Sequence, residues 1–237
     1  MSTNLTIDMA AQPDDVTCGP TCLQALYRYY GGKPNITQLS KEVRMLDEGG
    51  TMAVFLANHA LANGYTARIY TYNLQLFDPS WFDNPAVDLA ERLRAQARLK
   101  RARRLQVATR GYLQFLELGG ELRLQDLNAN LIRKYLRRGT PILTGLSSTY
   151  LYRSMREIDE TCADDDIRGE PAGHFVVLSG YDPESRHVRI ADPWPEHPYE
   201  PSHDYEVTID RLIGAILLGV MTYDANLLII EPPRKTA

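Results

Sequence analysis

The spacing of apolar residues predicts helices in the first quarter of the chain. Apolar side chains recur every three or four residues up to Tyr30, and Thr17 is a suitable N-cap, so a helix is expected from Thr17 to Tyr30. The pair Gly31-Gly32 ends this helix. Further elements of this zone are expected at 37–46 and 52–63, as helices, and at 65–72, as a strand.

The pattern changes between about residues 78 and 126. After a loop rich in proline and asparagine, a long helical pattern runs from Ala86 to about Leu118. Between 86 and 110, eight lysine or arginine residues face two acidic ones, a local charge of +6. Such charge runs are mostly solvated helix faces. The alternative is a lid over a substrate cleft that docks on an acidic partner, for which the chain's own acidic loop at 157–170 is a candidate.

The last part of the chain predicts one helix followed by strands joined by hairpins. The helix is expected at 127–136 and the strands at 141–146, 174–181, 186–191 and 227–230. Helices that precede antiparallel strands favour an α+β fold, in which N-terminal helices pack on an antiparallel sheet, over a doubly wound fold. We expect a single domain over residues 1–237, with a helical insertion at about 78–126.

Composition excludes several classes of protein. The net charge of −4 provides no global positive field for nucleic acid. The longest apolar stretch, 212–221, has ten residues, whereas a membrane-spanning helix needs about 20, so no membrane span is expected. The N-terminus lacks the pattern of a secretory signal. Three cysteines exclude a disulfide scaffold, and a cytoplasmic location is the default expectation.

Cys18 is the best candidate nucleophile among the three thiols. It opens the first predicted helix, where unpaired N–H groups and the helix dipole favour a thiolate. The next residue, Gly19, lets a substrate approach the backbone closely. Cys22 lies one turn further and is expected to be a small buried apolar residue. Cys162 is surrounded by carboxylates, which oppose a thiolate.

His174 is the best candidate base for that thiol. It opens the strongest predicted strand, whereas the other histidines, 59, 187, 197 and 203, lie in a helix, beside a turn or in loops. With a turn at 182–185, equal counting along both strands places His174 opposite residue 192 or 193. A carboxylate at Asp192 can then accept the ring N–H and leave the other ring nitrogen facing Cys18.

Acyl transfer also needs hydrogen-bond donors for the oxyanion that develops on the substrate. The backbone N–H of Cys18 is one candidate. The side-chain amide of Gln12, six residues upstream, is a candidate for the second.

The combination of Gln12, Cys18-Gly19-Pro20, Gly173-His174 and Asp192-Pro193 resembles the papain-like cysteine peptidases, and more narrowly the bacteriocin-leader-processing peptidase family. The resemblance covers about 8–72 and 127–200. It implies that the glutamine serves the oxyanion hole, the cysteine attacks, the histidine is the base and the aspartate orients it. Typical members are fused to a membrane exporter, so the resemblance is to a stand-alone relative. The basic segment 78–126 and the acidic loop have no counterpart in the family pattern.

These observations predict a cysteine peptidase or amide hydrolase that cleaves peptides through a thioester, with no cofactor and no metal. A zinc site built from Cys18, Cys22, Cys162 and a histidine has no compact spacing. The run 164–166 lacks the alternation of a calcium loop. Two alternatives remain open: a peptidyl or γ-glutamyl transferase that uses the same triad, and an inactive module that binds peptides. The expected partner is a peptide or protein substrate, and the oligomeric state is left open.

Overall fold

A computed structural model describes residues 2–158, 161–199 and 202–233 of the chain. Its helices are α1 Cys18–Tyr29, α2 Ile36–Glu42, α3 Ala53–Ala62, α4 Ser80–Asp83, α5 Leu89–Leu99, α6 Arg103–Glu117, α7 Ala129–Leu136, α8 Ser148–Tyr152, α9 Ile209–Leu218 and the 3-10 helix η1 Gly219–Thr222. Its strands are β1 Thr3–Asn4, β2 Thr66–Thr71, β3 Glu121–Arg123, β4 Ile142–Ser147, β5 Glu157–Ile158, β6 Ala163–Asp164, β7 Gly173–Asp182, β8 His187–Ala191, β9 Asp204–Thr208 and β10 Asn226–Glu231.

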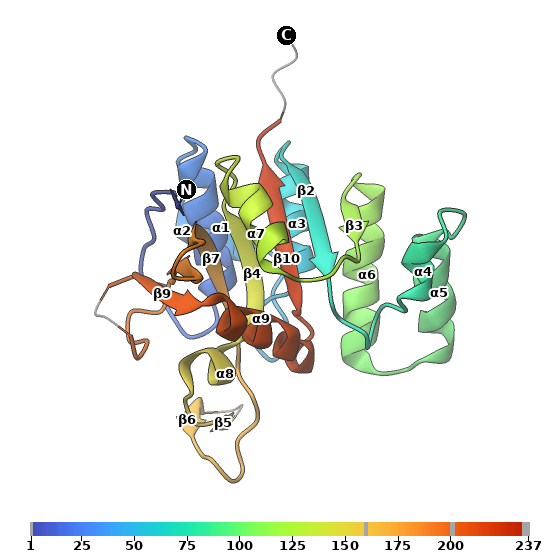
Figure 1. Ribbon diagram of the computed structural model, residues 1–237. Helices are drawn as coiled ribbons and strands as arrows, with labels where there is room; N and C mark the ends of the chain where they lie inside the picture. The colour runs from blue at the N-terminus through green and yellow to red at the C-terminus, as the bar shows by residue number, and fades with distance from the viewer. Residues whose placement is uncertain (1, 159–160, 200–201, 234–237) are drawn as a thin grey trace.

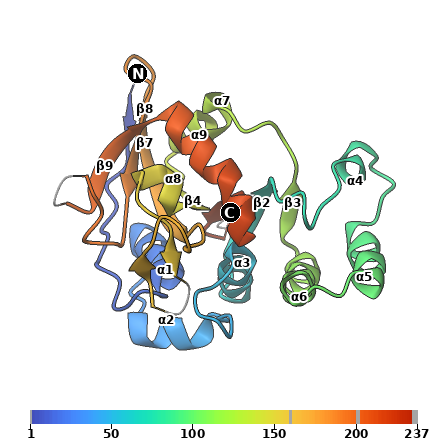
Figure 2. The same ribbon diagram turned by 90° about the horizontal axis from the view of Figure 1, so that it is seen from below.

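A twisted sheet forms the centre of the molecule, and helices cover both of its faces (Figures 1 and 2). The strand order is β3-β2-β10-β4-β7-β8-β9, with β1 also paired to β7. Neighbouring strands are antiparallel except for β2 and β3, which are parallel. The predicted α+β class, with helices packed on an antiparallel sheet, is therefore confirmed.

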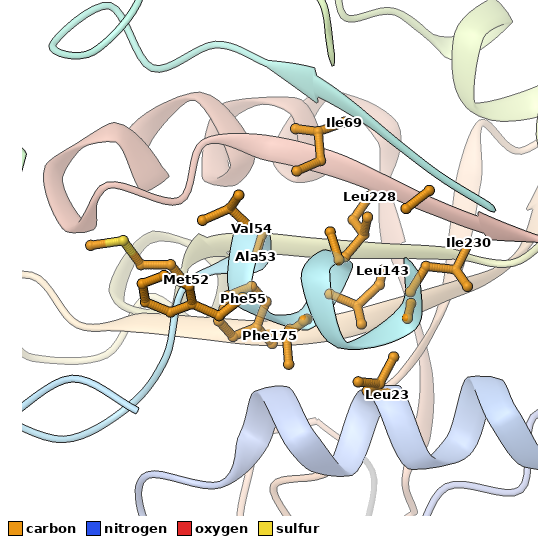
Figure 3. Packing of buried hydrophobic residues seen from close by; sticks show 14 of the residues in the cluster. Leu23, Met52, Ala53, Val54, Phe55, Ile69, Leu143, Phe175, Leu228 and Ile230 are labelled. Carbon is orange, nitrogen blue, oxygen red and sulfur yellow. The ribbon is translucent and has the colours of Figure 1, made fainter. Parts of the chain in front are cut away.

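Two hydrophobic clusters lie on the two faces of the sheet. Phe175 and Val177 belong to the cluster that packs under α1 and α3, whereas Val176 and Leu178 belong to the cluster under α7 and α9. This alternation along β7 is the period-two pattern of a strand that is buried on both faces. Figure 3 shows the first cluster from close by, with Leu23 of α1 directed toward the sheet. These contacts fix the start of α1 beside the start of β7.

The basic segment forms a helical hairpin and not the single long helix that its pattern predicts. Helices α5 and α6 are separated by residues 100–102, which carry no large apolar side chain. The side-chain amide of Gln106 donates to the carbonyl oxygens of Ala97 and Lys100, both at 2.7 Å, and so satisfies the end of α5. Leu93 and Leu105 are buried in this hairpin. The second predicted helix also differs, because it ends at Glu42.

The basic helices have an acidic partner other than the one the sequence suggests. Arg103 pairs with Asp47, and Arg104 lies 3.7 Å from Glu48, so α6 contacts the loop between α2 and α3. In the acidic loop 157–170, Asp165 instead pairs with Arg168 at 2.6 Å. Both views separate the β5–β6 hairpin from α5 and α6 (Figures 1 and 2). The expectation that the loop and the basic helices form one lid is therefore wrong. Positions 159–160 of the loop lie outside the described residues.

Within the described part of the chain, every helix is too short or too polar to cross a lipid bilayer.

Candidate active site

Cys18 is the first residue of α1, as predicted. Thr17 occupies the N-cap position, but its side chain makes no capping hydrogen bond and its Oγ1 atom lies 3.4 Å from the carbonyl oxygen of Asp14. The first N–H groups of a helix have no partner within the helix. Because Thr17 does not cap them, the N–H groups of Cys18 and Gly19 remain directed toward the end of α1, where they favour a negative charge.

His174 is the second residue of β7, and its ring lies between a carboxylate and the thiol of Cys18. The Nε2 atom is 2.8 Å from Oδ1 of Asp192, and the side chain of His174 is 9% exposed. Burial alone would lower the pKa of His174, but the charges of Asp192 and Cys18 and hydrogen bonds to both outweigh it and raise the pKa to about 10. This environment favours the imidazolium form of His174.

Asp192 is completely buried, and its two carboxylate oxygens accept four hydrogen bonds. Oδ1 accepts from His174 and from the N–H of Trp194 at 2.9 Å. Oδ2 accepts from the hydroxyl groups of Tyr152 and Tyr205, both at 2.6 Å. Burial alone would raise the pKa of Asp192, but His174 and the two tyrosines lower it below its ordinary value. The carboxylate is therefore held ionised inside the protein.

The predicted strand register is wrong, although the predicted pair of side chains meets. In the hairpin, Val177 pairs with Ala191, so continuing the register places Asp192 level with Val176 and not with His174. The turn is centred later than predicted, because Asp182 pairs with His187, and the extra residue that a β-bulge between Leu178 and Gly180 inserts into β7 offsets only one residue of this difference. His174 and Asp192 are therefore diagonal neighbours, and the imidazole reaches along β7 to the carboxylate.

Gln12 lies beside this pair in the loop that precedes α1. Its backbone N–H donates to the carbonyl oxygen of Pro193 at 2.9 Å, which ties the loop to the residue after Asp192. Its side-chain Nε2 donates to the carbonyl oxygen of Asp14 at 2.8 Å, and its buried Oε1 has no hydrogen-bond partner. The loop that holds Gln12 thus contacts the residue after Asp192, and one of the two amide hydrogens of Gln12 is engaged by Asp14.

The other thiols have the surroundings that the sequence predicts. Cys22 is buried, its Sγ atom donates to the carbonyl oxygen of Phe175 at 3.2 Å, and burial raises its pKa well above the ordinary value. Cys162 is exposed on the β5–β6 hairpin. Neither thiol combines a helix start with a neighbouring imidazole, so Cys18 alone has both features among the three.

The remaining histidines have structural partners. His59 lies between the hydroxyl of Tyr27, at 2.9 Å, and Glu42, at 3.1 Å. His203 contacts the backbone oxygen of Asp192 through Nδ1 at 2.7 Å, and His197 contacts the carbonyl oxygen of Ser202 at 2.7 Å. The loop after β8 therefore folds back around the buried carboxylate.

Gly19 has a packing role that differs from the predicted one. A Cβ atom there would lie 2.6 Å from Cγ2 of Thr51 and 3.2 Å from the ring of Phe175. The space beside this glycine is thus filled by the protein itself. The glycine lets α1 approach β7 and the loop before α3 closely enough to place Cys18.

Comparison with known proteins supports the predicted enzyme class. Residues 109–209 match the family model described as "Peptidase_C39 like family". The matched segment contains His174 and Asp192, whereas Cys18 and Gln12 lie outside it. The chain resembles the C39-like cysteine peptidases. The predicted resemblance and the predicted enzyme class, a cysteine-type peptidase, are thereby confirmed.

The fold is similar to that of a solved structure over nearly all of the chain. A putative C39-like peptidase from Bacillus anthracis is 16% identical, with 99% of this chain and 100% of that chain covered and a TM-score of 0.53. Xylellain, a cysteine protease from Xylella fastidiosa, is 14% identical over 98% of this chain and 86% of its own, with a TM-score of 0.47. A double glycine motif protease from an AMS/PCAT transporter, in complex with its leader peptide, is 13% identical over 97% and 94%, with a TM-score of 0.46. No curated protein matches this chain.

Two residues of the site were missed by sequence reasoning. Tyr152 belongs to α8 and Tyr205 to β9, and they reach Asp192 from positions 40 and 13 residues away. No local pattern marks either tyrosine, because buried tyrosines are common in hydrophobic cores. Within residues 2–158, 161–199 and 202–233, histidine, cysteine and carboxylate side chains form no group of three or more that could hold a metal ion.

Proposed function

We propose that this chain hydrolyses peptide bonds, with Cys18 as nucleophile, His174 as general base and Asp192 as the group that orients the base. The observation that carries the proposal is the 2.8 Å contact between His174 and Asp192 on a ring whose other side faces Cys18. A nucleophile, a base and an orienting group in this order are the components of thiol-based acyl transfer.

Activation of the thiol follows from the direction of the imidazole ring. Because Nε2 is engaged by Asp192, Nδ1 of His174 is the nitrogen that takes the proton of Cys18. The resulting imidazolium is stabilised by the buried carboxylate, and the thiolate by the N-terminus of α1. Transfer of this proton thus activates the thiol for attack.

The bond changes then follow in two steps. The thiolate of Cys18 attacks the amide carbon, and the oxyanion that forms accepts hydrogen bonds from the N–H of Cys18 and from the side-chain amide of Gln12. The C–N bond breaks as His174 gives its proton to the leaving amine, which leaves a thioester on Cys18. His174 then takes a proton from water, the resulting hydroxide attacks the thioester, and the acid product leaves with the thiol restored.

The side-chain amide of Gln12 has a second hydrogen for this role. One hydrogen of its Nε2 already donates to Asp14, and the second can donate to an oxyanion. Its buried Oε1 has no partner, so its amide is held by a single side-chain contact. Loss of the second oxyanion donor costs roughly 10²–10³-fold in rate. Gln12→Ala is expected to lower kcat within that range.

Thiol labelling tests the pair directly. Iodoacetamide should alkylate Cys18 faster than Cys162 at pH 6–7, and peptide mapping by mass spectrometry locates each adduct. His174→Ala should slow alkylation of Cys18 and leave the rate at Cys162 unchanged. An unchanged rate at Cys18 in this variant would contradict the proposal.

Product analysis tests the reaction. Cys18→Ala should abolish cleavage of a mixed peptide library, and Cys162→Ser, a matched change of an exposed thiol, should not. Mass spectrometry in the presence of added amines distinguishes hydrolysis from transfer, because a transferase gives amide products. Binding of peptides without products in the unmodified protein would instead identify a binding module.

A further inference from the structure

A second candidate ligand site lies on the face of the sheet that α7 covers. A half-open pocket of about 420 Å³ lies between β2, β3 and the end of α7. Pockets of a few hundred Å³ are the usual size for small ligands. Its lining is predominantly charged and consists of Arg68, Tyr70, Glu121, Arg123, Gln125, Lys134 and Arg138.

The lining of this pocket has an excess of positive charge. Four of the lining side chains are cationic and one, Glu121, is anionic, which gives +3 in a chain whose net charge is −4. Glu121 is shared between two arginines: Oε2 pairs with Arg68 and Oε1 with Arg123. The carboxylate of Glu121 neutralises one of the two arginines, so Arg68, Arg123 and Glu121 together carry a net charge of +1.

Arg68 is held in a fixed position at the wall of the pocket, whereas Arg123 is 59% exposed and pairs with Glu121. Nη1 of Arg68 donates to the hydroxyl of Tyr135 at 2.8 Å, and the same hydroxyl lies 2.8 Å from that of Tyr70. Tyr70 and Tyr135 are both buried in the cluster under α7. A guanidinium oriented in this way by buried groups loses little side-chain entropy when it binds an anion.

Lys134 and Arg138 supply the remaining positive charge. They are four residues apart, so they lie on the same side of α7 and its C-terminal turn. Lys134 lies over the ring of Tyr135, with Nζ 5.5 Å from the centroid. Among the described residues, no carboxylate forms an ion pair with Lys134 or Arg138. Two cations thus line the pocket without a counter-charge.

The pocket is separate from the candidate active site. Arg68 is level with Ile229, Ile142 and Leu178 in successive strands. Leu178 is four residues beyond His174 and three strands from β2, which corresponds to roughly 20 Å along the sheet. Helix α1, which carries the thiol, covers the opposite face from α7 (Figure 2). A ligand in this pocket would not contact the catalytic groups.

We propose that this pocket binds small molecules that carry at least two negative charges, of the phosphate-ester or polycarboxylate class. The planar guanidinium of Arg68, at a fixed position, matches the paired oxygens of phosphate and carboxylate groups, and Lys134 and Arg138 neutralise the second charge. The pocket's polar lining and its opening to solvent suit a hydrated anion and not an apolar ligand.

A charge-matched pair of double variants tests this proposal. Isothermal titration calorimetry at fixed ionic strength measures binding of pyrophosphate and of citrate, which distinguish the phosphate from the carboxylate source. Lys134→Gln with Arg138→Gln removes two charges from the pocket. Arg133→Gln with Arg137→Gln removes two charges from the same helix at residues that do not line it. Thermal unfolding of each variant without ligand checks that it folds.

The expected result is at least a 10-fold weaker affinity for one or both anions in the first double variant, with the second within about twofold of the unmodified protein. The ligand should also raise the melting temperature of the unmodified protein and of the second variant in proportion to its binding. Equal weakening in the two double variants would show only the effect of net charge and would overturn the proposal. Failure of both anions to bind the unmodified protein would also overturn it.

Discussion

His174 and Asp192 form a buried pair in which Nε2 of the imidazole lies 2.8 Å from Oδ1 of the carboxylate. The opposite oxygen of the carboxylate is held by the hydroxyl groups of Tyr152 and Tyr205. Two segments that follow the β4 and β8 strands therefore meet at one carboxylate, and that carboxylate fixes the imidazole beside Cys18. This relationship leads to predictions about activity, stability and their dependence on pH.

The first prediction concerns Asp192→Asn, which removes the charge and keeps the shape of the side chain. Burial lowers the pKa of His174, and the charge of Asp192 is the largest influence that raises it to about 10. Without that charge the imidazolium loses its proton at a lower pH. The alkaline limit of kcat/KM should therefore move to lower pH, and activity at pH 7 should fall by at least about 10²-fold.

A pH profile of kcat/KM with a peptide substrate measures this shift. Asp204→Asn is a matched control, because Asp204 is a partly exposed carboxylate on the adjacent strand and pairs with Arg189 at 3.3 Å. Its profile should follow that of the unmodified protein. If Asp192→Asn lowered the rate but left the alkaline limit in place, the carboxylate would not control the charge of His174.

The second prediction concerns the two tyrosines behind the carboxylate. Burial and the adjacent charge of Asp192 raise the pKa of both hydroxyl groups, so they remain hydrogen-bond donors across the working pH range. Tyr152→Phe and Tyr205→Phe each remove one donor from Oδ2, which should cost about 1–3 kcal/mol of unfolding free energy per variant. The double variant should lose more than the sum, because Oδ2 then has neither donor.

Urea unfolding of the single and double variants completes this thermodynamic cycle. Tyr150→Phe, a change at an exposed tyrosine of the same helix as Tyr152, should alter stability by less than about 0.5 kcal/mol. Strict additivity of the two buried changes would mean that the hydroxyls act on Asp192 independently.

The sequence indicated Cys18 and His174 as candidates because both lie at the start of regular elements with strong patterns. Cys18 begins a helix with a clear apolar stripe, and His174 is the second residue of a strand that is apolar on both faces. Asp192 was found by counting from a turn, but the register was wrong because the turn is centred later than predicted, with Asp182 paired to His187. The β-bulge between Leu178 and Gly180 leaves no recognisable mark in the sequence, and it offsets one residue of this difference. The tyrosine donors could not be predicted, since only tertiary packing brings them to Asp192.

The fold was predictable to the same extent. Long periodic segments such as α1, α3 and β7 matched their predicted positions within two residues. Short elements were missed, among them β3, with three residues, and β9, with five. A three-residue strand has no measurable period, and it forms because β2 offers a free edge. The break between α5 and α6 was missed because lysine and arginine are good helix formers, whereas the buried contacts of the hairpin favour a turn.

The third prediction concerns Gly19→Ala. The new Cβ atom would lie 2.6 Å from Cγ2 of Thr51, so the start of α1 must move or strain its neighbours. Overpacking of this kind costs about 1–3 kcal/mol. Since Cys18 is adjacent, kcat should also fall. Thr51→Ser removes the clashing methyl group and keeps the hydroxyl that donates to the carbonyl oxygen of Arg44 at 2.7 Å.

The double variant Gly19→Ala with Thr51→Ser should therefore recover part of both losses. Thermal unfolding and steady-state kinetics measure the recovery, and Thr51→Ser alone is the reference. Full loss of activity that persists in the double variant, with stability restored, would indicate that the glycine is needed for substrate access and not for packing.

The fourth prediction concerns Asp224, a buried carboxylate outside the triad. Oδ1 of Asp224 accepts from the N–H of Ala53 at 2.9 Å, at the start of α3, and from Nδ2 of Asn226 at 3.1 Å. Burial raises its pKa to about 7, although these hydrogen bonds and the charge of Arg104 act in the opposite direction. The folded state therefore holds a proton that the unfolded state releases near pH 4.

This difference sets the sign of a stability change. A carboxyl group with a raised folded-state pKa favours folding fully below its unfolded pKa, and this contribution is lost as the pH rises from about 4 through 7. Asp224→Asn keeps an acceptor for the N–H of Ala53 and removes the ionisation. The difference in unfolding free energy between this variant and the unmodified protein should therefore shift in the variant's favour with rising pH, by up to about 4 kcal/mol between pH 4 and 8.

Urea unfolding at pH 4, 5, 6, 7 and 8 measures that difference. Asp210→Asn is the control, because Asp210 is exposed and pairs with Arg186 at 3.0 Å on the surface, where an ion pair contributes little. The unfolding free energy of Asp210→Asn should change with pH in the same way as that of the unmodified protein. If the unfolding free energies of Asp224→Asn and the unmodified protein changed equally with pH, Asp224 would be ionised without cost in the folded state. The start of α3 and Asn226 would then fully compensate for its burial.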